Sequence, residues 1–100
     1  MNQLDPRGLS KSVFGNSYML EVCTRIAAHS ESRLTLTGLL AADSISPSLF
    51  VSPIERLAAA GLLIDEGRDP TDHRRHWYRR ADTLLWNAAV ELANTSADQP

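Results

Sequence analysis

The stretch LTGLLAADSISPSLFVSPIERLAAAGLL, residues 36–63, carries the most information about the fold. Its apolar residues recur at helical spacing in two groups, which predicts two amphipathic helices joined by a tight turn. The segment DEGRDPTDHRRHWYRR follows at residues 65–80. Gly67 and Pro70 mark a turn there between short apolar runs, so this segment is expected to form a β-hairpin rich in arginine and histidine. The order is therefore helix, turn, helix and basic hairpin.

The second helix of the pair is expected over residues 47–60. Ser46 is a suitable cap because its hydroxyl can accept a hydrogen bond from a first-turn amide, and Pro47 fits the first helical position, where a missing amide costs nothing. Gly61 is expected to end the helix, because glycine adopts the left-handed conformation cheaply. The residues expected on its buried side are Phe50, Ile54, Leu57, Ala58 and Gly61.

Pro53 falls inside this expected helix. A proline there removes one backbone hydrogen bond and crowds the carbonyl of Leu49, at a cost of about 3 kcal/mol unless the helix bends. The run Ser52-Pro53-Ile54-Glu55 is itself a good helix start, with a cap, then a proline, then a glutamate. Two arrangements are therefore open. One is a kinked but continuous helix, which we favour, and the other is two pieces over residues 47–51 and 53–60.

Helical periodicity predicts two further helices around this pair. One covers residues 17–29, and its apolar stripe includes Cys23. The other covers residues 82–94, starts with Asp82 as its cap, and is apolar on nearly all sides, so another surface must cover it. Shorter elements are expected as a helical turn over 9–14, a strand over 33–35, a helix starting at Thr35 or Thr37, and hairpin strands over 62–64 and 76–79 joined by a turn over 67–72. Residues 1–10 and 95–100 are expected to be flexible.

Length and composition favour one compact domain. One hundred residues with a hydrophobic fraction of 43% suffice for a single core. No apolar run approaches the roughly 20 residues of a membrane span, and the N-terminal residues lack a hydrophobic secretory stretch. The single cysteine, Cys23, cannot form an internal disulfide and fits a reducing compartment. We therefore expect a cytoplasmic protein without membrane association.

Charge is unevenly distributed along the chain. The formal net charge is −2, yet five of the ten basic residues fall within thirteen consecutive positions, at Arg68, Arg74, Arg75, Arg79 and Arg80. After Asp69 and Asp72 are subtracted, residues 68–80 carry +3, so the remainder of the chain carries −5. A molecule with one electropositive end is suited to docking on a polyanion such as nucleic acid. The alternative is a solvated loop that happens to be basic.

Three short motifs precede the hairpin: Ile45-Ser46-x-Ser48, Ile54-x-Arg56-Leu57 and Ala60-Gly61-Leu62-Leu63. Together with the hairpin strand that ends in Tyr78-Arg79, they make the chain resemble winged helix-turn-helix regulators of the ArsR and MarR type. The resemblance covers roughly residues 20–80. It implies an α+β, mostly α fold, a winged helix-turn-helix with a small β-hairpin wing, that occupies residues 1–100 as a single domain.

The resemblance also implies roles for individual residues. Residues 47–60 become the recognition helix in the major groove of double-stranded DNA, and residues 66–76 become a basic wing on the DNA backbone. The positions that would face DNA from the helix are Pro47, Ser48, Leu49, Ser52 and Arg56. Those that would face DNA from the wing are Arg68, His73, Arg74 and Arg75.

The function predicted is sequence-specific DNA binding as a dimeric transcriptional regulator. A homodimer is expected because the apolar final helix, residues 82–94, and the N-terminal segment could pair across a twofold axis. The alternative is a winged helix that serves as a protein–protein interaction module. In that case Leu49, Val51 and Pro53 would form an apolar patch for the partner.

Other chemistries find little support in the sequence. No Ser/His/Asp set and no glycine-rich phosphate loop stand out, so we expect neither enzyme activity nor a cofactor. Asp72, His73 and His76 offer nitrogen and oxygen ligands, but the spacing of the histidines along a strand puts them on opposite faces, so no metal site is expected. Cys23 is expected to be an inert buried thiol. Trp77 is expected to pack the hairpin onto the core, with base stacking as the less favoured role.

Overall fold

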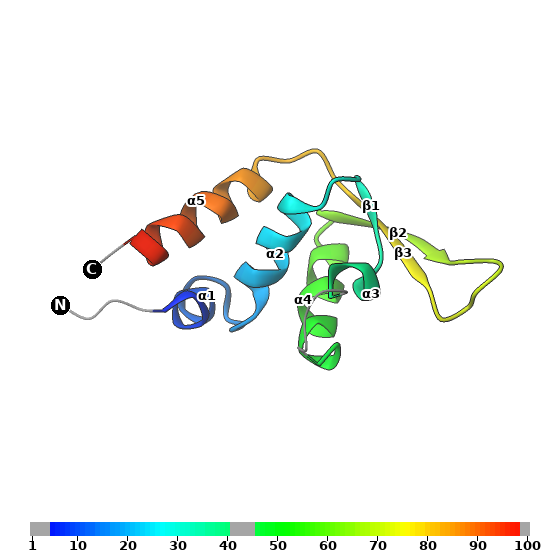
Figure 1. Ribbon diagram of the computed structural model, residues 1–100, viewed down its shortest axis with the longest axis horizontal. Helices are drawn as coiled ribbons and strands as arrows, with labels where there is room; N and C mark the ends of the chain where they lie inside the picture. Colours follow the sequence, from blue (N-terminus) through cyan, green and yellow to red (C-terminus); the bar gives the residue numbers. More distant parts are fainter. Residues whose placement is uncertain (1–4, 41–45, 99–100) are drawn as a thin grey trace. The chain divides into compact units, whose positions relative to one another are not determined.

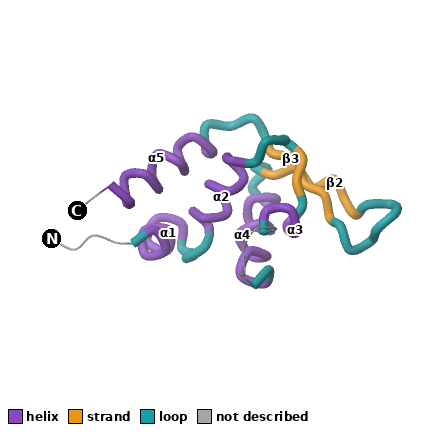
Figure 2. The backbone as a smooth tube through the Cα atoms, viewed as in Figure 1, coloured by secondary structure: helices purple, strands orange, loops and turns teal. Residues whose placement is uncertain are grey.

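The computed structural model describes residues 5–40 and 46–98 (Figure 1). Its elements form two compact units: a helical unit of α1, α2 and α5, and a sheet unit of β1, α3, α4, β2 and β3. Figure 2 distinguishes the helices and strands along the same path. No helix within the described residues is both long and apolar enough to cross a membrane. The bounds of the elements are α1 (Pro6–Phe14), α2 (Met19–Ala28), β1 (Arg33–Leu34), α3 (Leu36–Leu39), α4 (Ser48–Ala59), β2 (Leu63–Arg68), β3 (His76–Arg80) and α5 (Leu85–Asp98).

In the helical unit, α1 has clear start and stop signals. The Asp5 carboxylate accepts a hydrogen bond from the Gly8 amide at 2.6 Å, and Pro6 occupies the first turn. The helix ends at Gly15, whose φ of 75° lies in the left-handed region, as the predicted stop there requires. The start differs from the prediction, since α1 includes residues for which the sequence predicted a flexible arm. The Asp5 cap is the physical reason, because it stabilises the first turn.

A buried serine joins α1 to α2. Ser10 is fully buried, and its hydroxyl donates to the carbonyl of Asn16 at 2.6 Å and accepts from the amide of Leu20 at 2.9 Å. It thereby provides partners for two backbone groups, each of which would cost about 1–3 kcal/mol if buried without one. Hydrophobic periodicity gives no sign of this role, because serine is usually a surface residue.

The core of the helical unit lies where α2 and α5 pack against each other. Its buried residues are Met19, Leu20, Val22, Cys23, Ile26, Trp86 and Ala89. The predicted start of the last helix is wrong: α5 begins at Leu85, and Asp82 lies outside it, because a bend and a turn follow β3. The helix also continues to Asp98, past the predicted end at residue 94.

The sheet unit contains a three-stranded antiparallel sheet in the order β1-β3-β2. The predicted short strand at residues 33–35 is confirmed as β1. The register between β2 and β3 shifts between Asp65 and Gly67, where Gly67 has a left-handed φ of 82°. Because pairing resumes after this bulge, β2 extends to Arg68, and the turn begins later than the predicted residues 67–72.

Thr35 decides where the first helix of the pair begins. Its hydroxyl accepts a hydrogen bond from the Gly38 amide at 3.0 Å, so α3 starts directly after it, rather than after Thr37. Leu39 and Leu40 at the end of this helix are buried. The predicted stop at residues 43–44 and the inward position of Ile45 lie outside the described residues.

The second helix, α4, runs without interruption through Pro53. The continuous helix favoured from the sequence is therefore confirmed, and the two-piece alternative is wrong. The Pro53 ring is fully buried, so its packing compensates in part for the lost backbone hydrogen bond. Ser46 does not cap the helix, because its hydroxyl lies 2.9 Å from that of Ser48; α4 begins at Ser48, after a Pro47 whose backbone is already helical.

The inner side of α4 is the one predicted from periodicity. Phe50, Ile54 and Leu57 are all buried, and Ala58 is half-buried. Gly61 follows the helix with a left-handed φ of 79°, as the predicted stop requires. Its predicted place on the buried side is wrong, because it lies beyond the end of the helix and is exposed. The buried residues of the sheet unit are Leu34, Leu39, Leu40, Phe50, Pro53, Ile54, Leu57 and Leu63.

Candidate nucleic-acid interface

The outer face of α4 is polar and exposed. Ser48, Ser52 and Arg56 recur every four residues, so they share one face of the helix, opposite the buried residues. Leu49 is 40% exposed, and Pro47 at the start of the helix is exposed as well. The structure thus places all five helix positions assigned to DNA on the surface.

Carboxylates hold the wing in shape. Asp69 accepts hydrogen bonds from the Thr71 amide at 2.8 Å, from the Thr71 hydroxyl at 2.7 Å and from Trp77 Nε1 at 3.1 Å. The hydrogen bonds from Thr71 and Trp77 hold the pKa of Asp69 well below its usual range. Asp72 accepts from the Arg74 amide at 3.1 Å and from Arg74 Nε at 3.2 Å. The two acids that lower the net charge of this segment therefore order the loop that presents its arginines.

The four residues assigned to the wing surface are all exposed. Arg68 donates from Nη1 to the carbonyl of His73 at 2.8 Å, which closes the loop across the hairpin. The Arg74 side chain is 92% exposed despite its bond to Asp72. The Arg75 guanidinium lies 6.0 Å from the centroid of the Trp77 ring. These cationic groups remain accessible to an anion in solvent.

Arg33 of β1 and Arg79 of β3 both form ion pairs with Glu66 on the sheet. Glu66 accepts hydrogen bonds from Arg33 Nε at 2.7 Å and from the Arg79 guanidinium, and these bonds lower the pKa of Glu66. The Arg33 guanidinium also lies over the Trp77 ring, 4.3 Å from its centroid. Because Glu66 compensates Arg79, the available basic surface is smaller than the charge count of residues 68–80 implied.

His76 and Tyr78 share the other face of the sheet, because side chains two residues apart on a strand point to the same side. Their rings stack with centroids 4.6 Å apart and planes 10° from parallel. His76 Nε2 lies 2.5 Å from the Asp65 carboxylate, and this bond, with one from the Gly67 amide, lowers the pKa of Asp65. Burial raises the pKa of Tyr78, and the negative charges of Asp65 and Glu55 add to the effect. Glu55 of α4 is therefore close enough to this face to act on it electrostatically.

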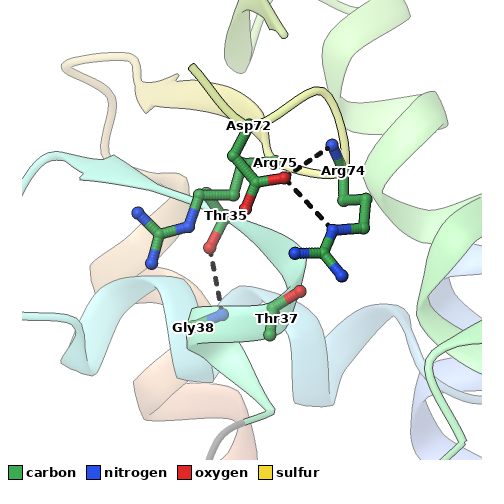
Figure 3. A pocket seen from close by; sticks show the side chains of 6 residues that line it. All are labelled: Thr35, Thr37, Gly38, Asp72, Arg74 and Arg75. Carbon is green, nitrogen blue, oxygen red and sulfur yellow. Dashed lines mark hydrogen bonds and ion pairs between the residues drawn. The ribbon is translucent and has the colours of Figure 1, made fainter. Parts of the chain in front are cut away.

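A hollow of about 500 Å³ separates the start of α3 from the wing (Figure 3). We call it the α3–wing hollow. In Figure 3 the guanidinium groups of Arg74 and Arg75 lie on either side of the Asp72 carboxylate, with Thr35, the cap of α3, between them and Thr37 of α3 below. Two cationic groups and two hydroxyls therefore border one open space, which suits an anionic oxygen group.

A second hollow, of about 470 Å³, lies between α4 and the wing. We call it the α4–wing hollow. It shares Thr35, Thr37 and Arg74 with the first, so the two form one concave surface. Further residues on its lining are Val51 and Glu55 from α4 and Arg68 from the wing. The fold thus brings the side of α4 that carries Val51 and Glu55 next to the wing arginines.

This arrangement differs from the site predicted from the sequence in two respects. Ser48, Ser52 and Arg56 are not among the residues that line these two hollows, although they share α4 with residues that do. Conversely, sequence reasoning missed Thr35 and Glu55. Thr35 was recognised only as a possible start of a helix, and a single glutamate on an amphipathic helix carries no signal that distinguishes it from a solvated surface charge.

Cys23 is fully buried in the helical unit, and burial raises its pKa to about 12. The group is therefore a thiol at neutral pH, in agreement with the inert role expected for it. Over residues 5–40 and 46–98, the structure places no three metal-ligating side chains together.

Comparisons with known proteins bear on the fold. No family model matches the sequence, and no curated protein matches it. Among solved structures, the chain is similar to BpsR of Bordetella bronchiseptica, a protein whose DNA binding is regulated by 6-hydroxynicotinic acid, with a TM-score of 0.65 and 19% sequence identity. The match covers 89% of this chain and 65% of that chain. The chain therefore has the winged helix-turn-helix fold, α+β and mostly helical, that its sequence motifs predicted.

Proposed function

We propose that the protein binds double-stranded DNA through its sheet unit and acts as a sequence-specific transcriptional regulator. The observation that carries this proposal is the concave surface where α3, α4 and the wing meet, with Arg68 and Arg74 on its lining. The similarity of fold to BpsR, a protein whose DNA binding is regulated, supports the same class of function. We also propose that the whole chain acts as one winged-helix domain.

The geometry suggests how the surface would dock. The major groove of B-DNA is about 12 Å wide and admits one α-helix, which would be α4 with its serines toward the bases. Arg74 and Arg75, at the edge of the α3–wing hollow, would then bind phosphate oxygens, with the Thr35 and Thr37 hydroxyls as further donors. Phosphate contacts of this kind supply affinity and orientation but no sequence information.

Selection of bound sequences from a random duplex pool tests this proposal. We expect enrichment of a defined sequence, and an affinity that falls with salt at a slope of about −0.9 in log–log units for each phosphate contacted. Retention on random duplex at low salt should be lost at moderate salt for the same reason. A protein that is not retained on duplex DNA or heparin even at low salt would contradict the proposal.

We further propose that the helical unit forms a homodimer. Leu84, directly before α5, is 82% exposed, and Val13 of α1 and Val90 of α5 are exposed as well. A twofold dimer would bury these side chains and would place two copies of α4 about one DNA turn, roughly 34 Å, apart on a palindromic site.

Light scattering at tens of micromolar protein is expected to give twice the 11.0 kDa mass of the chain. Leu84→Asp should shift the protein toward the monomer, because it would place a charge in an apolar interface. Leu49→Asp is the matched control, since Leu49 is an exposed apolar residue of the sheet unit, and this variant should keep the mass of the parent. A parent protein that is only monomeric would contradict the dimer.

A winged helix that binds a partner protein is the second candidate. Leu49 and Val51 are each 40% exposed and favour it, but Pro53, the third residue of the predicted patch, is buried and cannot take part. The remaining apolar patch is small, which is why we favour DNA. Stoichiometric co-purification of one protein without any retention on duplex DNA would reverse this preference.

A further inference from the structure

Glu55 stands out among the carboxylates near the proposed interface. It is exposed on α4 and lines the α4–wing hollow together with Arg68 and Arg74. Within the described part of the chain, no hydrogen bond or ion pair engages its side chain. The carboxylates of the sheet and wing all have such partners, namely Asp65, Glu66, Asp69 and Asp72. Glu55 is thus an accessible acceptor beside two arginines that do not bind it.

We infer that Glu55 is a specificity-determining residue whose carboxylate accepts a hydrogen bond from the N4 amino group of a cytosine in the major groove. The inference rests on the proposed function and adds a base preference to it. It assigns the recognition of bases to the side of α4 nearest the wing, where Glu55 lies one turn beyond Val51, as well as to the face that carries Ser48 and Ser52.

The chemistry of the groove favours cytosine as the base. A carboxylate can only accept hydrogen bonds, so it needs a base edge that presents a donor. In the major groove the amino groups are those of cytosine and adenine, and adenine also presents its N7 acceptor beside the donor, which repels an anion. Guanine presents acceptors alone on this edge, and thymine presents an acceptor and a methyl group.

The surrounding charges explain how an acid can serve in a surface that binds a polyanion. Arg68 and Arg74 border the same hollow and can hold the flanking phosphates, which offsets the repulsion of Glu55. Asp65, the other carboxylate on the lining, already has a partner in His76. Opposite any base without a hydrogen-bond donor, the Glu55 carboxylate would lose the water molecules that hydrate it and would gain no hydrogen bond in return. Glu55 therefore penalises incorrect bases, whereas Ser48 and Ser52 can donate to or accept from any base and discriminate weakly.

Glu55→Gln and Glu31→Gln, each compared with the parent in selection from a random duplex pool, test the inference. Glu31 is the matched control: it is exposed in the same unit, does not line the hollows, and its replacement removes the same charge. The parent should enrich a C·G pair at one position of each half-site, and changing that pair should cost it roughly tenfold in affinity.

Glu55→Gln should lose this preference at that position alone, or exchange it for adenine, which a glutamine amide binds in a bidentate manner. Glu31→Gln should select the same site as the parent, and both variants should bind random duplex slightly more tightly because each removes one negative charge.

If the parent selects a site and Glu55→Gln selects the same one, the inference is wrong and the proposed function stands. If the parent binds duplex without selecting any sequence, the inference is also wrong. If the parent binds no DNA, both fail.

Discussion

The double variant Arg74→Ala, Arg75→Ala is expected to bind every duplex sequence more weakly than the parent, by a factor on the order of 100, because each arginine should supply one charge-assisted bond to phosphate. The slope of log affinity against log salt should become shallower by about 1.8, which corresponds to two phosphate contacts. The sequence selected from a random pool should not change, since phosphate contacts carry no base information. Fluorescence anisotropy at several salt concentrations measures all three quantities.

The structure makes this variant a clean test of the wing. The Arg74 side chain is 92% exposed, so its removal leaves no cavity. The matched control is Arg7→Ala, Lys11→Ala, which removes the same charge from α1 in the helical unit. If the control weakened binding as much as the wing variant did, net charge would account for the effect. If the wing variant bound as tightly as the parent, the wing would not contact DNA.

Phe50→Ala should have the largest effect on stability. Phe50 is among the largest fully buried side chains of the protein, and its truncation should lower the free energy of unfolding by about 3–5 kcal/mol. In a chain of this size, each kcal/mol moves the Tm by about 4–8 °C, so the variant should melt more than ten degrees below the parent. Thermal unfolding followed by circular dichroism measures the shift.

Leu49→Ala is the natural comparison, because Leu49 is the neighbour of Phe50 in the chain but is 40% exposed. It should cost less than about 1 kcal/mol, as is usual for partly exposed positions. Equal losses for the two variants would contradict the orientation of α4, which places one of these side chains in the core and the other on the surface.

Local signals in the sequence predicted much of the fold. The helix of residues 47–60 and its buried stripe follow from hydrophobic periodicity, and the end of the helix follows from the backbone conformations open to Gly61. Both signals act over a few positions of the chain. The predictions were less accurate where a boundary depends on a side-chain hydrogen bond or on a bulge. Asp5 starts α1 within a segment expected to be flexible, and Gly67 allows β2 to extend as far as Arg68.

The candidate site was less predictable than the fold. The sequence indicated the exposed positions of α4 and the wing arginines, since a basic hairpin after two helices is a local pattern. It did not indicate the approach of Glu55 to the wing, because residues in separate elements become neighbours only when the chain is folded. Ser10 is a comparable case: its role depends on two backbone groups of the following turn and helix.

By itself, the sequence determined the order of the elements, the inner face of α4 and the position of a basic hairpin, because helix and turn preferences are properties of short segments. Only the tertiary structure decided which charges remain available to a ligand. Glu66 binds Arg33, 33 positions away, and Arg79, whereas Glu55 shares a hollow with Arg68 and Arg74 without a bond to either. Electrostatic pairing depends on distance in space, and folding sets that distance independently of separation along the chain.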